Sequence, residues 1–329
     1  MEKNLVIDDW DKMIDNPQTN PINAYSNYYG QEYSYELDND LGSSGEYTQG
    51  AGAIALLIKE DPQLMVIEPE WGVATQSEHD FFKPIRLKMS EGNLVELHDE
   101  KPVFDGQFSN QTYQERITEA WAHYEGESSI TSFGTLVFHL PYAFHGRRII
   151  APLYINELRQ QGLLRSLAQE VGLDPDSPDF NKAFTKTDFY KDWIGATIAK
   201  GELFSSAMGN LYTASIFLSL MSSLENGAQL EGERILFFAY GSGSKSKVFS
   251  AKLVEGFRDR VIDWKTVDQL EERKIINFEE YEELRTTLMQ RVIDPRAGFV
   301  QISSGSTELN RFSRQYAYRE AVTKSIPRS

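Results

Sequence analysis

The chain of 329 residues is 40% apolar and 12% aromatic, a composition that supports a buried core and excludes general disorder. Its formal net charge is −16, from 49 acidic and 33 basic residues. The sequence has no cluster of basic residues, which argues against a nucleic-acid partner. The sequence contains no cysteine, so these residues form no disulfide, no thiolate metal site and no thiol nucleophile.

Histidine spacing argues against a metal site, and hydropathy argues against a membrane span. The five histidines, at positions 79, 98, 123, 139 and 145, match no common zinc-ligand spacing, so no metal site is expected. No apolar run approaches the roughly 20 residues that cross a bilayer. The N-terminus is acidic where a secretory signal is basic and then apolar. We therefore expect a cytoplasmic chain with no membrane partner.

The first segment differs from the rest of the chain. Residues 1–41 are polar and rich in Asn, Asp and Tyr, and they favour loop apart from one short strand, Leu5–Ile7. From Gly50 the pattern becomes globular, and residues 42–329 are expected to form one domain. Two apolar runs, Ala53–Ile58 and Leu64–Ile67, predict two buried strands that are joined by a tight Asp-Pro turn.

The middle of the chain alternates between helix and strand patterns. Apolar residues at helical spacing predict an amphipathic helix over 110–124. Leu136–Leu140 is a strand pattern that Pro141 ends, and 145–161 is a helix pattern that ends near Gly162. Residues 163–200 are mixed and polar and have the character of an insertion.

The last third continues this alternation. Asn210 is expected to open a helix that runs to Leu224. The apolar runs Arg234–Tyr240 and Lys247–Val254 predict two strands on either side of a glycine turn, placed so that they could pair with each other. Residues 278–291 and 308–322 have helix patterns. Strands that alternate with helices predict a layered α/β fold.

Three short segments place polar groups at strand ends and a helix start, where α/β folds gather their ligands. They are Phe138–Tyr142, Gly209–Ser215 and Tyr240–Ser244. Each also has an ordinary structural interpretation. His139 fits a buried structural histidine, Asn210 fits a helix N-cap, and Gly-Ser-Gly is a common turn.

As an ordered set, the three segments resemble the C-terminal half of hydroxymethylglutaryl-CoA synthases, which are thiolase-like condensing enzymes. Further segments extend the resemblance over residues 42–325: Gly45–Ala53, Asp80–Pro84 and Asp105–Tyr113. The resemblance implies a thiolase-like layered α/β fold, mainly its C-terminal half, with the N-terminal half incomplete or absent.

The resemblance also implies a substrate site. His139 would hydrogen-bond and orient an acetoacetyl thioester, and Asn210 and Ser242 would hold its carbonyl and carboxylate oxygens. Asp80 and Thr48 match positions that line the same pocket. Fixed donors of this kind stabilise developing oxyanions because they are aimed before the reaction begins.

The implied CoA contacts match the family less completely. Arg147 and Arg148 match a basic pair after the histidine motif and would contact CoA phosphates. The family commonly has a lysine five residues after the histidine, and here that position is Phe144. The CoA thioester is a substrate, and no separate cofactor is expected.

The chain departs from the family in its nucleophile. The family forms an acetyl-enzyme on a cysteine and uses a glutamate to generate the attacking carbanion, and both residues belong to the N-terminal half. Three hypotheses stay open: a split synthase completed by a cysteine-containing subunit, a non-catalytic acyl-thioester-binding homologue, and a truncated synthase. The expected protein partner is a cysteine-containing N-terminal-half subunit or, as an alternative, a second copy of the chain. The implied reaction is hydroxymethylglutaryl-CoA synthesis in the mevalonate route, or polyketide β-branching on a carrier protein.

Overall fold

The computed structural model describes residues 46–50, 52, 54–82, 85–90, 93–98, 103–126, 129–286, 298–304 and 314–319. Residues 43–273 form one compact unit, and the described residues from 274 onward belong to a second. Segment 1–41 and its predicted strand Leu5–Ile7 lie outside the described residues.

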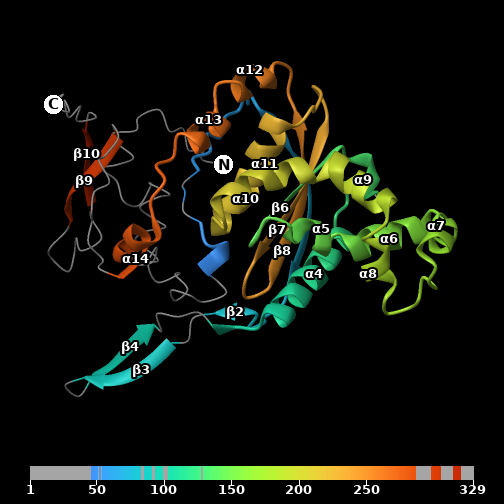
Figure 1. Ribbon diagram of the computed structural model, residues 1–329, viewed down its shortest axis with the longest axis horizontal. Coiled ribbons are helices and arrows are strands. Elements are labelled where there is room, and N and C mark those ends of the chain that lie inside the picture. Colours follow the sequence, from blue (N-terminus) through green and yellow to red (C-terminus); the bar gives the residue numbers. More distant parts are fainter. Residues whose placement is uncertain are drawn as a thin grey trace. The chain divides into compact units, whose positions relative to one another are not determined.

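A four-stranded mixed sheet forms the centre of the first unit (Figure 1). Its strands, in spatial order, are β1 (Met65–Thr75), β8 (Lys245–Leu253), β7 (Arg234–Gly241) and β6 (Thr135–Phe138). β6 runs parallel to β7, whereas β8 is antiparallel to both β7 and β1. The strands predicted at 136–140, 234–240 and 247–254 are confirmed within one or two residues, as is the pairing of the last two.

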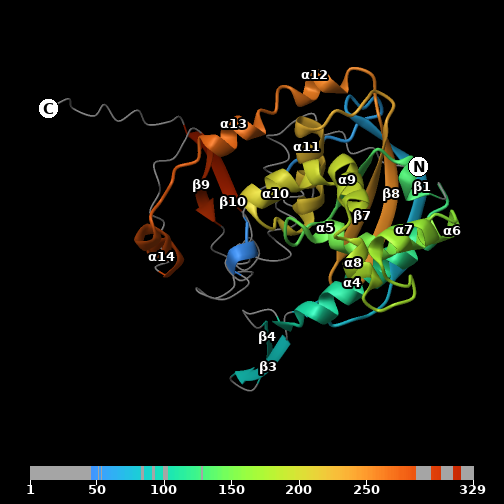
Figure 2. The ribbon, with the colours of Figure 1, turned by 45° about the vertical axis from the view of Figure 1, so that its right-hand side comes forward.

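Alternate residues of the sheet face two different helices. Phe138, Leu236, Phe238 and Val248 belong to a core that contains Tyr113, Ile117 and Ala120 of α4 (Gly106–Ala122). The intervening residues belong to a second core with α11 (Ser215–Asn226): Val137, Ile235, Phe237, Phe249 and Ala251. Helices therefore pack on both faces of the sheet, which confirms the layered α/β prediction (Figures 1 and 2).

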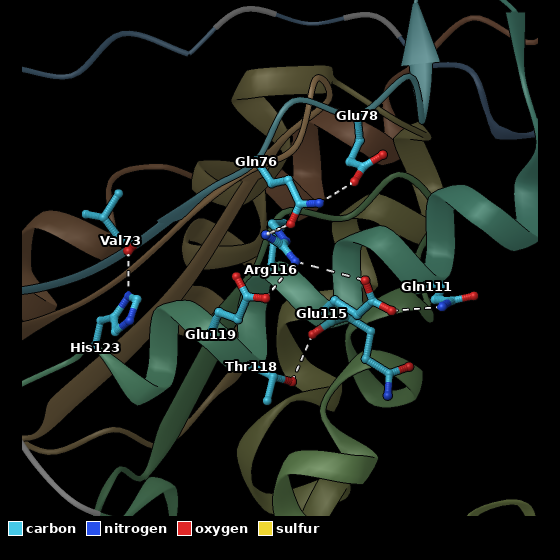
Figure 3. Close-up of polar contacts among 10 residues, drawn as sticks. Val73, Gln76, Glu78, Gln111, Glu115, Arg116, Thr118, Glu119 and His123 are labelled. Carbon is cyan, nitrogen blue, oxygen red and sulfur yellow. Dashed lines mark hydrogen bonds and ion pairs between the residues drawn. The ribbon is translucent and has the colours of Figure 1, made fainter.

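Polar contacts fix α4 against the end of β1 (Figure 3). The buried Arg116 donates from one terminal nitrogen to Gln76 Oε1 at 2.9 Å and from the other to Glu119 at 2.6 Å. At the C-cap of the helix, His123 Nδ1 lies 2.9 Å from the carbonyl oxygen of Val73. The helix predicted over 110–124 is confirmed, although it begins earlier because Asp105 caps its first turn.

The helix predicted over 145–161 divides into α5 (His145–Ile149) and α6 (Ala151–Gln160). Pro152, at the start of α6, has no N–H to continue a helix but suits a first turn. The polar segment after them is helical: α7 (Leu164–Val171), α8 (Phe180–Phe184) and α9 (Asp188–Thr197). Its apolar residues join the α4-side core, including Phe180, Phe184 and Ile194.

The remaining elements are short. In the first unit they are η1 (Glu46–Thr48), β2 (Phe81–Phe82), β3 (Ile85–Ser90), β4 (Asn93–His98), β5 (Val103–Phe104), η2 (Ile130–Ser132), η3 (Ala199–Glu202), α10 (Leu203–Met208), η4 (Tyr212–Ala214), α12 (Phe257–Val261) and α13 (Thr266–Glu271). The second unit contains α14 (Phe278–Thr286) and the antiparallel pair β9 (Gly298–Ser304) and β10 (Arg314–Arg319). No helix of the described part is long and apolar enough to cross a membrane.

Two predictions of secondary structure are wrong. Residues 54–58 form no strand, so the predicted hairpin with 64–67 does not exist. Residues 314–319 form a strand instead of part of a helix, and their Tyr-Ala-Tyr alternation fits the two-residue period of a strand. The helix predicted over 278–291 is confirmed as far as Thr286, and the rest of it lies outside the described residues.

Candidate functional site

His139 lies at the carboxyl end of β6, where its N–H donates to the carbonyl oxygen of Phe238 on the parallel neighbour β7. Its Nδ1 lies 2.6 Å from the hydroxyl oxygen of Ser215, the first residue of α11. The same hydroxyl accepts from the N–H of Leu140 at 3.1 Å. Ser215 is fully buried. One serine therefore fixes both the imidazole and the backbone that follows it.

Burial sets the protonation state of His139. It lowers the pKa of this side chain to about 4, although a hydrogen bond with the backbone of Tyr212 acts in the opposite direction. The imidazole is therefore neutral at pH 7. A neutral imidazole has one donor and one acceptor nitrogen, and the contacts with Ser215 and Tyr212 hold this ring in a fixed orientation.

Asn210 is held by close contact between two backbones. Its N–H donates to the carbonyl oxygen of Thr48 at 2.7 Å, and its own carbonyl oxygen accepts from Gly50 at 3.1 Å. A Cβ atom on Gly50 would meet the carbonyl oxygen of Met208 at 2.1 Å, so glycine is required here. The Asn210 side chain accepts from the Tyr212 N–H at 2.8 Å. It therefore caps a turn before α11, which begins five residues later than predicted.

Ser242 lies exposed in the turn between β7 and β8. The fully buried Asp80 anchors this turn, since its carboxylate accepts from the Gly243 N–H at 2.8 Å and from the hydroxyl of Tyr240. Burial and the bond to Asp80 raise the pKa of Tyr240 well above its ordinary value. In the structure, Asp80 holds the Ser242 turn in place.

Tyr113 of α4 connects the histidine segment to the serine turn. Its ring stacks on Tyr240 with centroids 4.3 Å apart, and its hydroxyl donates to the carbonyl oxygen of His139 at 2.6 Å. The segments around His139 and Ser242 thus meet at the carboxyl ends of neighbouring parallel strands. This is where α/β sheets place their ligands. That the side chains of His139, Asn210 and Ser242 share one pocket stays a prediction.

The two arginines of the predicted CoA contact have different surroundings. Arg147 forms a two-point ion pair with Glu202, whose side chain is 2% exposed, and its guanidinium lies 4.8 Å from the Phe144 ring centroid. Arg148 is exposed, and its guanidinium lies 5.6 Å from the ring centroid of Tyr142. Arg147 therefore joins α5 to the buried carboxylate before α10, whereas Arg148 faces outward.

His145, which the sequence analysis did not select, is buried beside this site. Its ring centroid lies 4.7 Å from those of Tyr113 and Tyr142, and no side chain or backbone atom of the described residues hydrogen-bonds either ring nitrogen. Burial lowers its pKa to about 3, and the nearby charges of His139 and Arg148 act in the same direction.

Ser215 and Tyr113 are the supporting residues that sequence reasoning missed. Ser215 ends the segment chosen for Asn210, and Tyr113 lies in the predicted helix and ends the segment Asp105–Tyr113, but neither was given a polar role. Their polar contacts span 76 and 26 residues of chain, which no local pattern reveals.

Comparison with known proteins identifies the family of this chain. Residues 67–312 match the family model for the C-terminal domain of hydroxymethylglutaryl-coenzyme A synthase. The chain is 30% identical over 263 residues to a hydroxymethylglutaryl-CoA synthase of Haloferax volcanii and 27% identical over 257 residues to one of Enterococcus faecalis. The matches cover 74% and 77% of this chain and 56% of each relative. It thus spans about half the length of these curated relatives.

Solved structures agree on the fold. MvaS in complex with 3-hydroxy-3-methylglutaryl coenzyme A has a TM-score of 0.66 at 24% identity, covering 86% of this chain and 65% of that one. The curacin pathway HMG synthase in complex with apo donor-ACP has a TM-score of 0.52 at 20% identity, covering 78% and 59%. The fold is therefore that of the thiolase-like condensing enzymes. Within that class the chain belongs to the hydroxymethylglutaryl-CoA synthase family, and it carries the family's C-terminal domain.

Proposed function

We propose that this chain provides the substrate-orienting part of a hydroxymethylglutaryl-CoA synthase site and binds acetoacetyl-CoA. The observation that carries the proposal is the neutral His139, which Ser215 fixes at the carboxyl end of β6. The backbone contacts that hold Asn210 and the Asp80 anchor of the Ser242 turn support the same interpretation.

The sulfur nucleophile of such a site has to come from outside these 329 residues, because they contain no cysteine. We propose that a cysteine-bearing polypeptide supplies it and that the chain alone does not condense acetyl-CoA with acetoacetyl-CoA. The proportion of each relative that the chain spans, 56%, supports a missing complement of similar size.

A second candidate is an acyl-thioester-binding homologue with no catalytic role, which the absence of cysteine favours. A carrier-protein-bound acyl group, as in polyketide β-branching, is the corresponding alternative substrate. The curacin HMG synthase, solved with a donor-ACP, is the structural neighbour that motivates this alternative.

Calorimetric titration of the chain with acetoacetyl-CoA tests the proposal. We expect binding that His139→Ala and Asn210→Ala each weaken by about tenfold, or roughly 1.4 kcal/mol, which is the order of one lost hydrogen bond. Ser206→Ala, at an exposed position in α10, is the control and should bind normally. No binding at millimolar ligand would exclude both candidates.

A further inference from the structure

Residues 54–58 carry more exposed apolar surface than an ordinary loop requires. Leu56 is 48% exposed, Leu57 65% and Ile58 83%. Three consecutive large aliphatic side chains in water are unfavourable, since burying each would contribute about 1.5–3 kcal/mol. Exposed apolar surface of this kind marks an interaction site.

The same residues have the composition of a strand that both sides of a sheet would bury. Ile54-Ala-Leu-Leu-Ile58 is continuously apolar, and Asp61-Pro62 bounds it. The central sheet has the spatial order β1-β8-β7-β6, and residues 54–58 belong neither to it nor to any other sheet of the described residues. No backbone hydrogen bond joins residues 54–58 to another described segment. The segment therefore offers free backbone donors and acceptors together with its apolar side chains.

The start of this segment is anchored at the candidate site. Gly50 donates to the carbonyl oxygen of Asn210, and Ile54 packs against the apolar cluster that contains Leu211. At no more than about 3.6 Å per residue, residues 54–58 begin within roughly 14 Å of Gly50. A partner that covered them would lie close to Asn210.

We propose that residues 54–58 are a docking strand, which pairs with an open sheet edge of the polypeptide that supplies the rest of the condensing fold. This inference rests on the proposed function. An extended peptide that adds to a sheet gains backbone hydrogen bonds, and its alternate side chains enter apolar layers on the two faces. Because Leu57 would face opposite to Leu56 and Ile58, the partner needs a sheet covered on both faces, which a folded domain provides and a single helix does not.

The share of a relative's length that the chain matches indicates the size of this partner. The match covers 56% of the Haloferax volcanii synthase, which leaves 44% of that protein as the complement. Strand pairing at 54–58 would bring this complement next to Asn210, as a site shared between two polypeptides requires.

The test co-expresses this chain with that complement of the Haloferax volcanii synthase as a separate polypeptide. We expect a one-to-one complex in which the amides of residues 55–58 exchange with deuterium at least tenfold more slowly than in the chain alone. Leu57→Asp and Ile58→Asp should reduce recovery of the complex at least tenfold. Leu230→Asp is the matched control, since Leu230 is 73% exposed in another loop, and it should have no effect.

Three results would contradict the proposal that residues 54–58 are a docking strand. They are the absence of a complex with the wild-type chain, recovery of the complex unchanged by Leu57→Asp, and slow amide exchange at 55–58 that arises from self-association of the chain. Circular dichroism of both Asp variants should match the wild type, because exposed substitutions seldom change stability by more than about 0.5 kcal/mol. Binding of acetoacetyl-CoA by the chain alone is measured separately, so failure of the docking strand is distinguishable from failure of the proposed function.

Discussion

Ser215 Oγ lies 2.6 Å from His139 Nδ1 and also accepts from the N–H of Leu140, so one buried hydroxyl orients the imidazole and closes the end of β6. The hydroxyl comes from the first residue of α11, and the imidazole follows β6. The contact therefore couples the orientation of His139 to the position of a helix start.

Ser215→Ala should lower both stability and ligand affinity. It leaves the Leu140 N–H and the His139 ring nitrogen without their partner, and each buried unsatisfied group costs about 1–3 kcal/mol. Urea unfolding measures the stability, and titration with acetoacetyl-CoA measures the affinity. Ser206→Ala is the control, because Ser206 is an exposed residue whose hydroxyl donates to the Glu202 carbonyl oxygen one turn earlier and does not contact His139. An unchanged affinity in Ser215→Ala would show that Ser215 does not position His139.

Asp80→Ala should loosen the turn that carries Ser242. The change removes the acceptor for Gly243 N–H and Tyr240 hydroxyl, so we expect a loss of about 2–4 kcal/mol in the free energy of unfolding. Hydrogen exchange should accelerate at Gly243. Asp188→Ala, at an exposed helix start, should leave both measurements unchanged. A stable Asp80→Ala variant with a protected turn would contradict the anchoring role.

Substitution of Arg147 should affect stability, whereas substitution of Arg148 should affect CoA binding. Arg147→Ala leaves the buried Glu202 without its cation, and the free energy of unfolding should fall by about 3 kcal/mol. Arg148→Ala should preserve stability and weaken CoA binding by about tenfold, if the outward guanidinium contacts a phosphate. Thermal unfolding and titration with CoA give the two readouts. Equal stability losses would contradict this division.

Acid should destabilise the chain through its buried histidines. The pKa of His145 is about 3 in the folded chain, against about 6.5 when unfolded, so the unfolded state binds the extra proton first. Stability is fully present above about pH 7, and it falls by up to about 1.4 kcal/mol per pH unit for this group as the pH drops below 6.5.

His145→Met isolates this contribution. Methionine fills a similar buried volume and does not titrate, so the variant should lose stability less steeply between pH 6.5 and 5, as measured by urea unfolding. Ile262→Met, at an exposed position with no titratable side chain, should keep the wild-type slope. A His145→Met profile parallel to the wild type would contradict the buried neutral state of His145.

The sequence predicted the strands that consist of a continuous run of apolar residues. The apolar runs of β6, β7 and β8 lie in the sheet, and their residues alternate between the α4 and α11 cores as strand geometry requires. The run at residues 54–58 has the same pattern and forms no strand. A strand needs a neighbour, and the described part of this chain provides none.

Side-chain roles were less predictable than strands. That Asp80 lines the substrate pocket stays a prediction. Its contacts with the turn could not be predicted, because its partners lie 160 and 163 residues away in the sequence and only the fold brings them near. Asn210 has a capping interaction, as its residue type suggested, but in a turn before the helix rather than at the helix itself. The partners of His139 depend on where α11 begins, which the sequence placed five residues too early.

The measurement that tests the central claim most directly is the condensation of acetyl-CoA with acetoacetyl-CoA, followed as loss of acetoacetyl-CoA. We expect no turnover by the 329-residue chain alone, turnover when a cysteine-bearing complement is added, and none when that complement is paired with His139→Ala. Turnover by the chain without added protein would contradict the account, as would undiminished turnover with His139→Ala.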